Sequence, residues 1–181
     1  MVPQPVLAVM LLFPITEKSK ATPIGEVDMS SDAYFVKQTI GNACGTVAIV
    51  HALANNKDEI KFIDGKHFVH FMEKTIDLSP EKRAEFLESD TDMGSAHEDS
   101  AQKGQTQAPS ADEKVNTHFV AFVCKNNKLY EMNGSCDGPI FHQDTTPETL
   151  LQDAVVVVKK FMERDPTEVN FTLMALSKQS D

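Results

Sequence analysis

The sequence predicts a mixed α/β (α+β) domain, in which helices flank an antiparallel sheet and one helix lies buried in the core. Three segments indicate this architecture. Residues 42–54 are apolar nearly all round, as a buried helix is. Residues 115–132 contain two β-rich runs separated by the turn sequence Lys125-Asn-Asn-Lys128. Residues 6–13 form an uninterrupted apolar run, which is typical of a strand buried on both faces.

The first apolar run, Val6–Phe13, is too short to span a membrane, lacks a basic flank and is bracketed by prolines. We therefore expect neither a signal peptide nor a membrane helix here, but an interior strand with a neighbour on each side. The polar stretch from Glu17 to Ala33, which carries Pro23 and Gly25, is predicted to be a surface loop.

The middle of the chain is predicted to be helical and then polar. Residues 66–76 place apolar side chains at helical spacing. Ser79 and Pro80 mark a helix start, with a capping serine and a proline at the first helical position, and this helix should end near Glu88. Residues 89–110 are mostly polar, so we expect only a short helix over 96–102 and then a loop. Long polar loops of this kind are often functional.

The C-terminal part is predicted to hold one helix and one strand. The helix begins at Thr146-Pro-Glu148 and ends near Arg164, because Pro166 restricts the residue before it. Residues 169–176 alternate in hydrophobicity and are expected to form the final strand.

Composition limits the possible functions. The 181 residues include 27 acidic and 17 basic side chains, which give a net charge of −10. This charge disfavours nucleic acid and anionic membranes as partners. It suits a substrate with a basic tail, although an acidic solvated surface is the commoner cause of such a charge. Three irregularly spaced cysteines do not make a disulfide framework and favour a reduced, cytoplasmic protein.

Cys44 stands at the start of the predicted buried helix. Unpaired N–H groups and the positive end of the helix dipole favour its thiolate, the nucleophilic form. Gly45 leaves room for a substrate backbone, and Gln38 can offer an amide N–H to an oxyanion. A cysteine at such a place is more often a small core residue. Together with these neighbours, however, it indicates a cysteine hydrolase of the papain kind.

His118 is the candidate base, and it lies on the first strand of the predicted hairpin. If the turn holds two central residues, His118 stands opposite Ser135 and residue 120 stands opposite Asn133. His118 and Asn133 then share a face and can touch, so the amide oxygen would hold the imidazole tautomer that serves Cys44. A three-residue turn would reverse this parity.

Other candidate residues have weaker support. Cys124 and Cys136 lack such neighbours and are expected to be structural or incidental. His67 and His70 lie three apart on a predicted helix, but without a nearby third ligand a packing or solvated role is favoured over a metal site.

Several motifs form a characteristic set. They are Gln38–Thr46, His51–Asn56, Gly104–Thr106, Asp112–Val115, His118-Phe119 and Leu129–Glu131, with further matches at Leu12–Lys18, Lys159–Pro166 and Met174–Ser177. Together they resemble the ubiquitin C-terminal hydrolases, most closely the short L-type isozymes, from Val2 to about Ser177.

The resemblance implies a papain-like fold and a thiol protease activity, without cofactor or metal. The enzyme would be a monomeric deubiquitinase that cleaves small adducts from the C-terminal glycine of ubiquitin or a ubiquitin-like protein, in ubiquitin-dependent protein catabolism. Cys44 would be the nucleophile, Gln38 and the Cys44 N–H the oxyanion donors, His118 the base and Asn133 its orienter. The polar stretch 89–111 would cross the active-site cleft.

Two departures from the family stand out. The family has Asp where this chain has Asn133, so a carboxylate that would stabilise an imidazolium is missing. Papain-like enzymes use Asn in this role, and Asn before Gly134 is also ordinary turn chemistry. The family further carries a helix and an edge strand before the segment matching Val2-Pro3. We expect residues 1–181 to be a single catalytic domain without them, with reduced stability and weaker ubiquitin binding.

Two alternatives stay open at this point. In the first, the chain is a catalytically weak or inactive ubiquitin-binding remnant. In the second, it is a different thiol enzyme, such as an acyltransferase, that uses the same three side chains. A covalent ubiquitin-tail probe separates the first alternative from the enzyme, because only a reactive Cys44 becomes labelled.

Overall fold

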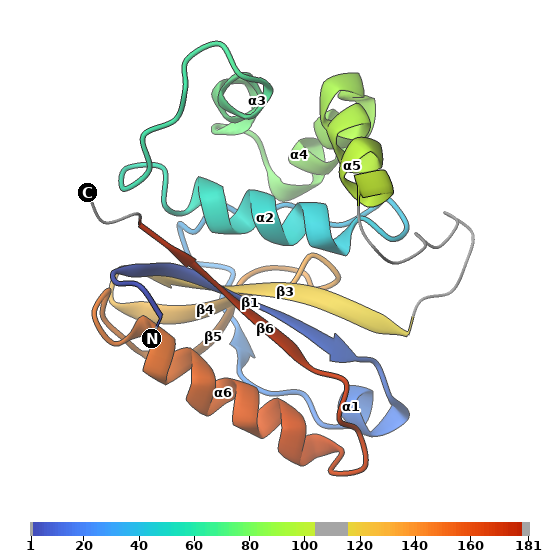
Figure 1. Ribbon diagram of the computed structural model, residues 1–181, viewed down its shortest axis with the longest axis vertical. Helices are drawn as coiled ribbons and strands as arrows, with labels where there is room; N and C mark the ends of the chain where they lie inside the picture. The colour runs from blue at the N-terminus through green and yellow to red at the C-terminus, as the bar shows by residue number, and fades with distance from the viewer. Residues whose placement is uncertain (1, 104–115, 179–181) are drawn as a thin grey trace.

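The computed structural model describes residues 2–103 and 116–178. Six strands form one antiparallel sheet in the order β2-β5-β4-β3-β1-β6 (Figure 1). The strands are β1 (Val6–Pro14), β2 (Glu26–Val27), β3 (Thr117–Lys125), β4 (Lys128–Met132), β5 (Ile140–Asp144) and β6 (Thr172–Ser177). The helices are α1 (Glu17–Ala21), α2 (Cys44–Ala54), α3 (His67–Thr75), α4 (Pro80–Ser89), α5 (Thr91–Lys103) and α6 (Leu150–Arg164). This is the predicted α/β architecture.

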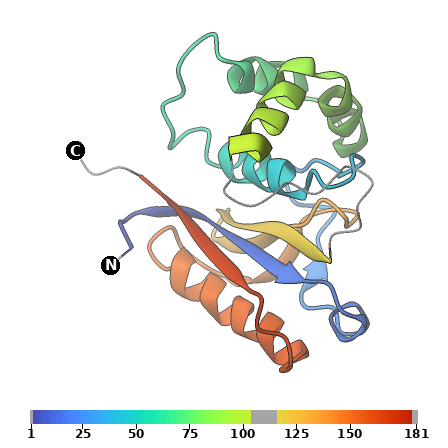
Figure 2. The same cartoon turned by 45° about the vertical axis from the view of Figure 1, so that its right-hand side comes forward.

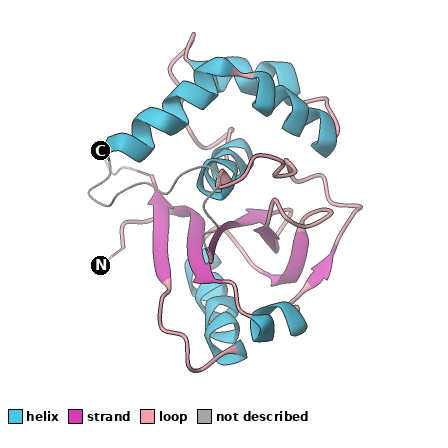
Figure 3. Cartoon of the chain, turned by 90° about the vertical axis from the view of Figure 1, so that its right-hand side faces the viewer, coloured by secondary structure: helices cyan, strands magenta, loops and turns pink. Residues whose placement is uncertain are grey.

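Helices cover both faces of the sheet (Figures 1 and 3). Helix α6 packs on one face, and α2 packs on the other with α3, α4 and α5 stacked beyond it (Figure 2). Apolar residues fill all three interfaces: one cluster lies between the sheet and α6, a second between the sheet and α2, and a third between α2 and the outer helices. Helix α2 is therefore enclosed on opposite sides, as its all-round apolar sequence predicted.

Strand β1 is an interior strand, as predicted. It pairs with β3 along one edge and with β6 along the other. Val9 and Leu11 are fully buried, and so is Ala8 on the opposite face. A strand enclosed in this way needs apolar residues at successive positions, which explains the unbroken run in the sequence.

The β3–β4 hairpin has the predicted register. Lys125 pairs with Lys128, and Ala121 pairs with Met132. The two central turn residues, Asn126 and Asn127, have φ angles of 51° and 59°. Asparagine tolerates this left-handed conformation, and two such residues in succession make the turn type that matches the twist of paired strands.

Capping explains where two of the outer helices begin. The Ser79 side chain accepts a hydrogen bond from the Lys82 N–H, and Pro80 occupies the first turn of α4, as predicted. Helix α5 is longer than the predicted 96–102. The Asp90 side chain accepts from the N–H groups of Asp92 and Met93, so the helix starts five residues earlier than expected. The rest of the expected loop, from residue 104 to 110, lies outside the described residues.

Two further predictions need correction, and one strand was missed. The stretch from Glu17 to Ala33 is not wholly a loop, because it contains α1 and the short strand β2. Thr16 and Ser19 form reciprocal capping hydrogen bonds that start α1. Strand β5 was not predicted. Helix α6 starts at Leu150, with Thr149 as its N-cap, and not at Thr146–Glu148. No helix among the described residues is long and apolar enough to cross a membrane.

Candidate active site

Cys44 is the first residue of α2, and it is half-buried. The N-cap residue is Ala43, whose methyl group cannot accept a hydrogen bond from the first turn. The Gly45 N–H, in the first turn of α2, donates to the Cys44 thiol. Gly45 packs close to the Phe119 ring, where an added Cβ would lie 3.5 Å from a ring carbon. The nucleophile candidate thus sits in the first turn of α2, beside β3.

His118 sets the acidity of the Cys44 thiol. Burial raises the pKa of Cys44, but a hydrogen bond and the charge of His118, with backbone N–H donors of Phe119 and Gly45, bring this pKa below its usual value. Burial lowers the pKa of His118, but hydrogen bonds with Cys44 and Asn133 bring it above its usual value. The two shifts favour the same state, a thiolate facing an imidazolium.

Asn133 holds the other side of the imidazole ring. The His118 Nε2 donates to the Asn133 Oδ1 across 2.8 Å, so the contact predicted from the hairpin register is present. The Ser135 N–H donates to the same oxygen across 3.1 Å, and the Ser135 hydroxyl lies 3.4 Å from the His118 Nε2. The ring is 7% exposed and meets Phe13 edge-on. Its orientation is therefore fixed from several sides.

Two buried residues behind Asn133 were not anticipated from the sequence. The Asn133 Nδ2 donates to the Glu131 Oε1 across 3.2 Å, and the Glu131 Oε2 accepts from the His142 Nε2 across 2.9 Å. The side chains of Glu131 and His142 are only 3% and 2% exposed. The one available signal was alternation: Glu131 lies two residues before Asn133 and so shares its face of the hairpin.

Gln38 reaches the site through its backbone. Its N–H donates to the Gly134 carbonyl across 2.9 Å, which joins the loop before α2 to the end of the hairpin. A Cβ added to Gly134 would lie 2.9 Å from the Gln38 Cβ and 3.0 Å from a Val47 methyl group, so only glycine fits. The Gln38 amide donates to the Ile40 carbonyl across 3.2 Å. It must release that bond to reach an oxyanion.

One polar residue of α2 and its C-cap residue clamp the segment that carries Gln38. The His51 Nε2 accepts from the Val36 N–H across 2.9 Å, and the Asn55 side chain bonds both the N–H and the carbonyl of Tyr34. Burial lowers the pKa of His51 to about 4, so this ring is neutral at pH 7. Sequence reasoning missed this role, for which the i, i+4 spacing on an otherwise apolar helix was the only sign.

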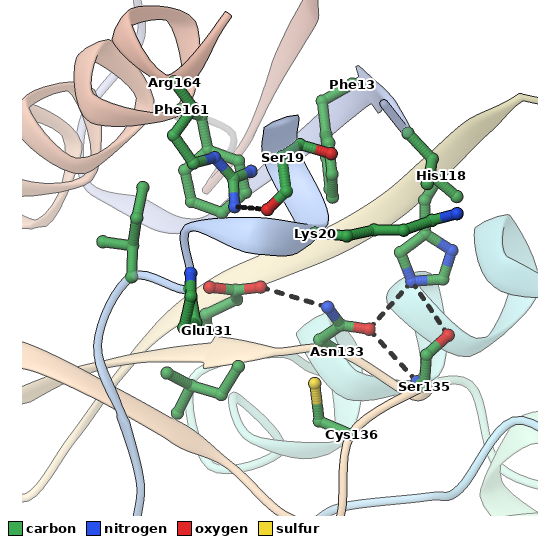
Figure 4. A pocket seen from close by; sticks show the side chains of 14 residues that line it. Phe13, Ser19, Lys20, His118, Glu131, Asn133, Ser135, Cys136, Phe161 and Arg164 are labelled. Carbon is green, nitrogen blue, oxygen red and sulfur yellow. Dashed lines mark hydrogen bonds between the residues drawn. The ribbon is translucent and has the colours of Figure 1, made fainter. Parts of the chain in front are cut away.

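A cavity of about 340 Å³ lies beside the imidazole (Figure 4). Phe13 and Phe161 give it aromatic walls, while Glu131, Asn133 and His118 give it a polar side. The other lining residues are Ile15, Ser19, Lys20, Pro23, Ile24, Ser135, Cys136, Ile140 and Arg164. The polar network around His118 therefore borders this cavity.

Cys124, His67 and His70 lie apart from this arrangement, whereas Cys136 lines the same cavity as His118. Burial raises the pKa of Cys124, and burial with the nearby Glu131 and Asp137 carboxylates raises the pKa of Cys136 to about 11. His67 pairs with Asp92 across 3.1 Å on the outer helices. No group of three or more potential metal ligands occurs within residues 2–103 and 116–178.

Comparisons with known proteins identify the family. The family model described as "Ubiquitin carboxyl-terminal hydrolase, family 1" matches residues 1–163. A ubiquitin carboxyl-terminal hydrolase of Aplysia californica is 55% identical over 168 residues, which cover 92% of this chain and 78% of that protein. The isozyme L1 of Rattus norvegicus is 42% identical over 183 residues, covering 98% of this chain and 81% of the relative.

A solved structure gives the same result for the fold. The catalytic domain of Trichinella spiralis UCH37, bound to ubiquitin vinyl methyl ester, superposes with a TM-score of 0.76 at 25% identity. The superposition covers 97% of this chain and 78% of that domain. With a helix-borne thiol, an imidazole and a side-chain amide assembled as described, the chain belongs to the ubiquitin carboxyl-terminal hydrolase family, a family of cysteine-type deubiquitinating enzymes.

Proposed function

We propose that Cys44 is the nucleophile of a hydrolase that releases adducts from the C-terminal glycine of ubiquitin or a ubiquitin-like protein. The observation that carries this proposal is the pair of opposite pKa shifts. The pKa of Cys44 is lowered and that of His118 is raised, and each side chain is a cause of the shift in the other. Structural cysteines lack such a partner.

The first chemical step is acylation of the thiol. The Cys44 thiolate attacks the carbonyl carbon of the terminal glycine, and a C–S bond forms as the carbonyl becomes an oxyanion. The Cys44 N–H and the Gln38 amide donate to this oxyanion, after the amide leaves the Ile40 carbonyl. The imidazolium of His118 gives its proton to the leaving group, and the bond to the leaving group breaks.

Hydrolysis of the thioester regenerates the enzyme. The now neutral His118 takes a proton from water as the oxygen attacks the thioester carbonyl. The C–S bond then breaks, Cys44 departs as thiolate, and the ubiquitin carboxylate is released. Asn133 holds His118 through both steps, because its Oδ1 accepts from the ring nitrogen that does not face the thiol.

Domain organisation, oligomeric state, location and partners are proposed from the packing and the composition of the chain. We expect residues 1–181 to act as one catalytic domain, because the three apolar clusters follow one another from α6 through the sheet and α2 to the outer helices. A monomer in the cytoplasm, with ubiquitin or a ubiquitin-like protein as partner and without nucleic acid or membrane, fits the three free cysteines and the net charge of −10.

Replacement of the nucleophile tests the proposal. Cys44→Ala should reduce turnover of a ubiquitin C-terminal fluorogenic substrate by at least about a thousandfold, since no other group can form the thioester. Cys124→Ala and Cys136→Ala are matched controls that remove a half-buried thiol whose pKa is raised, and each should retain most of the activity. An equal loss in Cys124→Ala would sink the assignment of Cys44.

A covalent probe tests the catalytic state directly. Ubiquitin vinyl methyl ester should add to Cys44, and mass spectrometry of the digested adduct should locate it there. Binding of ubiquitin without labelling would instead support an inactive ubiquitin-binding protein. Labelling without hydrolysis of any ubiquitin adduct would support an acyltransferase.

A further inference from the structure

We infer that Glu131 is a positioning residue for His118, and that it supplies from one hydrogen bond further away the negative charge that Asn133 lacks. This inference rests on the proposed function, since it concerns how the same imidazole is held and charged. It is carried by a continuous chain of hydrogen bonds that runs from the imidazole of His118 through Asn133 to Glu131 (Figure 4).

The geometry makes Glu131 responsible for the orientation of the Asn133 amide. An amide can turn over and exchange its oxygen and nitrogen, and only one orientation presents the oxygen to the imidazole. A carboxylate oxygen has no proton to donate, so the Glu131 Oε1 can pair with the amide nitrogen but not with the amide oxygen. It therefore selects the orientation in which the Asn133 Nδ2 faces it across 3.2 Å. The Asn133 Oδ1 is then directed to the His118 Nε2 across 2.8 Å.

Glu131 is itself held in place and shielded from water. Its second oxygen accepts from the His142 Nε2 across 2.9 Å, and both side chains are at least 97% buried. A buried carboxylate must have a partner for each oxygen, and these two contacts provide them. The carboxylate therefore cannot rotate away from Asn133 without losing a hydrogen bond at each end.

The following titratable groups face the hydrogen-bonded series from His118 to Glu131. Cys44 faces His118 from α2, and Glu131 faces it from β4. Arg164 on α6 and His142 on β5 face Glu131, while Cys136 lies in the loop after β4. Lys20 on α1 lines the same cavity. The Arg164 guanidinium donates to the carbonyls of Ser19 and Thr22, so its hydrogen bonds are directed toward the backbone.

The inference also changes what a carboxylate at position 133 would do. Asn133→Asp would set two carboxylates beside one another where an N–H···O contact of 3.2 Å now exists. Like charges at this distance disfavour each other, so one of the two acids would bind a proton. We expect Asn133→Asp alone to raise the His118 pKa little. The same substitution should raise this pKa more once the Glu131 charge has been removed.

The test is a cycle of variants in the full chain. Glu131→Gln keeps an acceptor for the Asn133 amide and removes the charge. It should lower the His118 pKa, measured by NMR, by about half a unit to one unit, and shift the alkaline limb of kcat/KM downward by the same amount. Adding Asn133→Asp to this variant should restore both values. Glu88→Gln, the same change on an exposed face of α4, is the matched control.

A second substitution separates position from charge. Glu131→Asp keeps the charge but shortens the side chain, so kcat should fall several-fold while the alkaline limb stays nearer to that of the parent. A His118 pKa in Glu131→Gln equal to that of the parent would overturn the inference, and so would a double variant that behaves like Glu131→Gln alone. The NMR titration needs no substrate, so a parent without hydrolase activity would reject the proposed function and leave this test intact.

Discussion

Two thiols lie near the same imidazole, and their pKa values are shifted in opposite directions. Cys44 and Cys136 are both half-buried, and burial raises the pKa of each. His118 and backbone N–H groups more than offset burial at Cys44, whereas the Glu131 and Asp137 carboxylates add to burial at Cys136. Burial therefore does not decide which of the two thiols has the lower pKa, and the sign of the neighbouring charge does.

The largest effect should come from removing the imidazole. His118→Gln takes away the hydrogen bond and the charge that lower the Cys44 pKa, so turnover should fall by at least about a hundredfold. Alkylation of Cys44 by iodoacetamide at pH 7 should slow as the thiolate fraction falls. His67→Gln, on an exposed part of α3, is the control and should change neither rate. An unchanged alkylation rate in His118→Gln would show that the helix start alone activates the thiol.

The parent protein should distinguish the two thiols by itself. A thiol with a pKa of about 11 is thiolate in only about one molecule in ten thousand at pH 7. Iodoacetamide should therefore modify Cys44 at least about a hundred times faster than Cys136. The selectivity should narrow as pH rises, because the Cys136 thiolate increases about tenfold per unit while that of Cys44 saturates. Peptide mapping at pH 7 and pH 9 measures both rates, and equal labelling at pH 7 would refute the comparison.

A smaller effect is expected from the residue that orients the imidazole. Asn133→Ala removes the 2.8 Å contact with His118, so kcat should fall about tenfold with little change in KM. Asn116→Ala is a suitable control, because Asn116 is exposed and uses its backbone carbonyl to bond the Ile15 N–H. If kcat is unaffected by Asn133→Ala, then Asn133 is a turn residue only.

The smallest effect should appear at the unreactive thiol. Asp137→Asn removes one of the charges that raise the Cys136 pKa, so alkylation of Cys136 at pH 9 should become about twofold faster. Asp137 is exposed, and solvent screens its charge, which is why the change is small. Asp58→Asn removes another exposed charge and should leave the rate as it was.

Local patterns predicted the parts of the fold that local chemistry decides. The two asparagines of the β3–β4 turn and the Ser79-Pro80 helix start were both placed correctly. Strand β2 was missed because it has only two residues and is stabilised by pairing with β5, which lies far along the chain. Strand β5 was also missed, and it is the segment that β2 pairs with. Helix α1 has only five residues and depends on a capping box, which is hard to recognise within a polar sequence.

The candidate site shows the same division. Cys44, His118 and Asn133 could be selected because each lies in a recognisable local setting, and the hairpin register brought the last two into contact. Glu131 and His142 could not, because a charged residue is expected at the surface unless tertiary structure supplies its partners. The clamp formed by His51 and Asn55 was missed for the same reason.

Gly134 brings a final consequence for the tolerance of this enzyme to mutation. It joins two segments almost a hundred residues apart in the chain, and the space for a methyl group is filled by Gln38 and Val47. A deep mutational scan scored on activity should therefore rank position 134 with the chemically active positions, although its residue has no side chain. Such a scan would mark Gly134 as catalytic, although its contribution is to let the end of the hairpin pack closely against Gln38 and Val47.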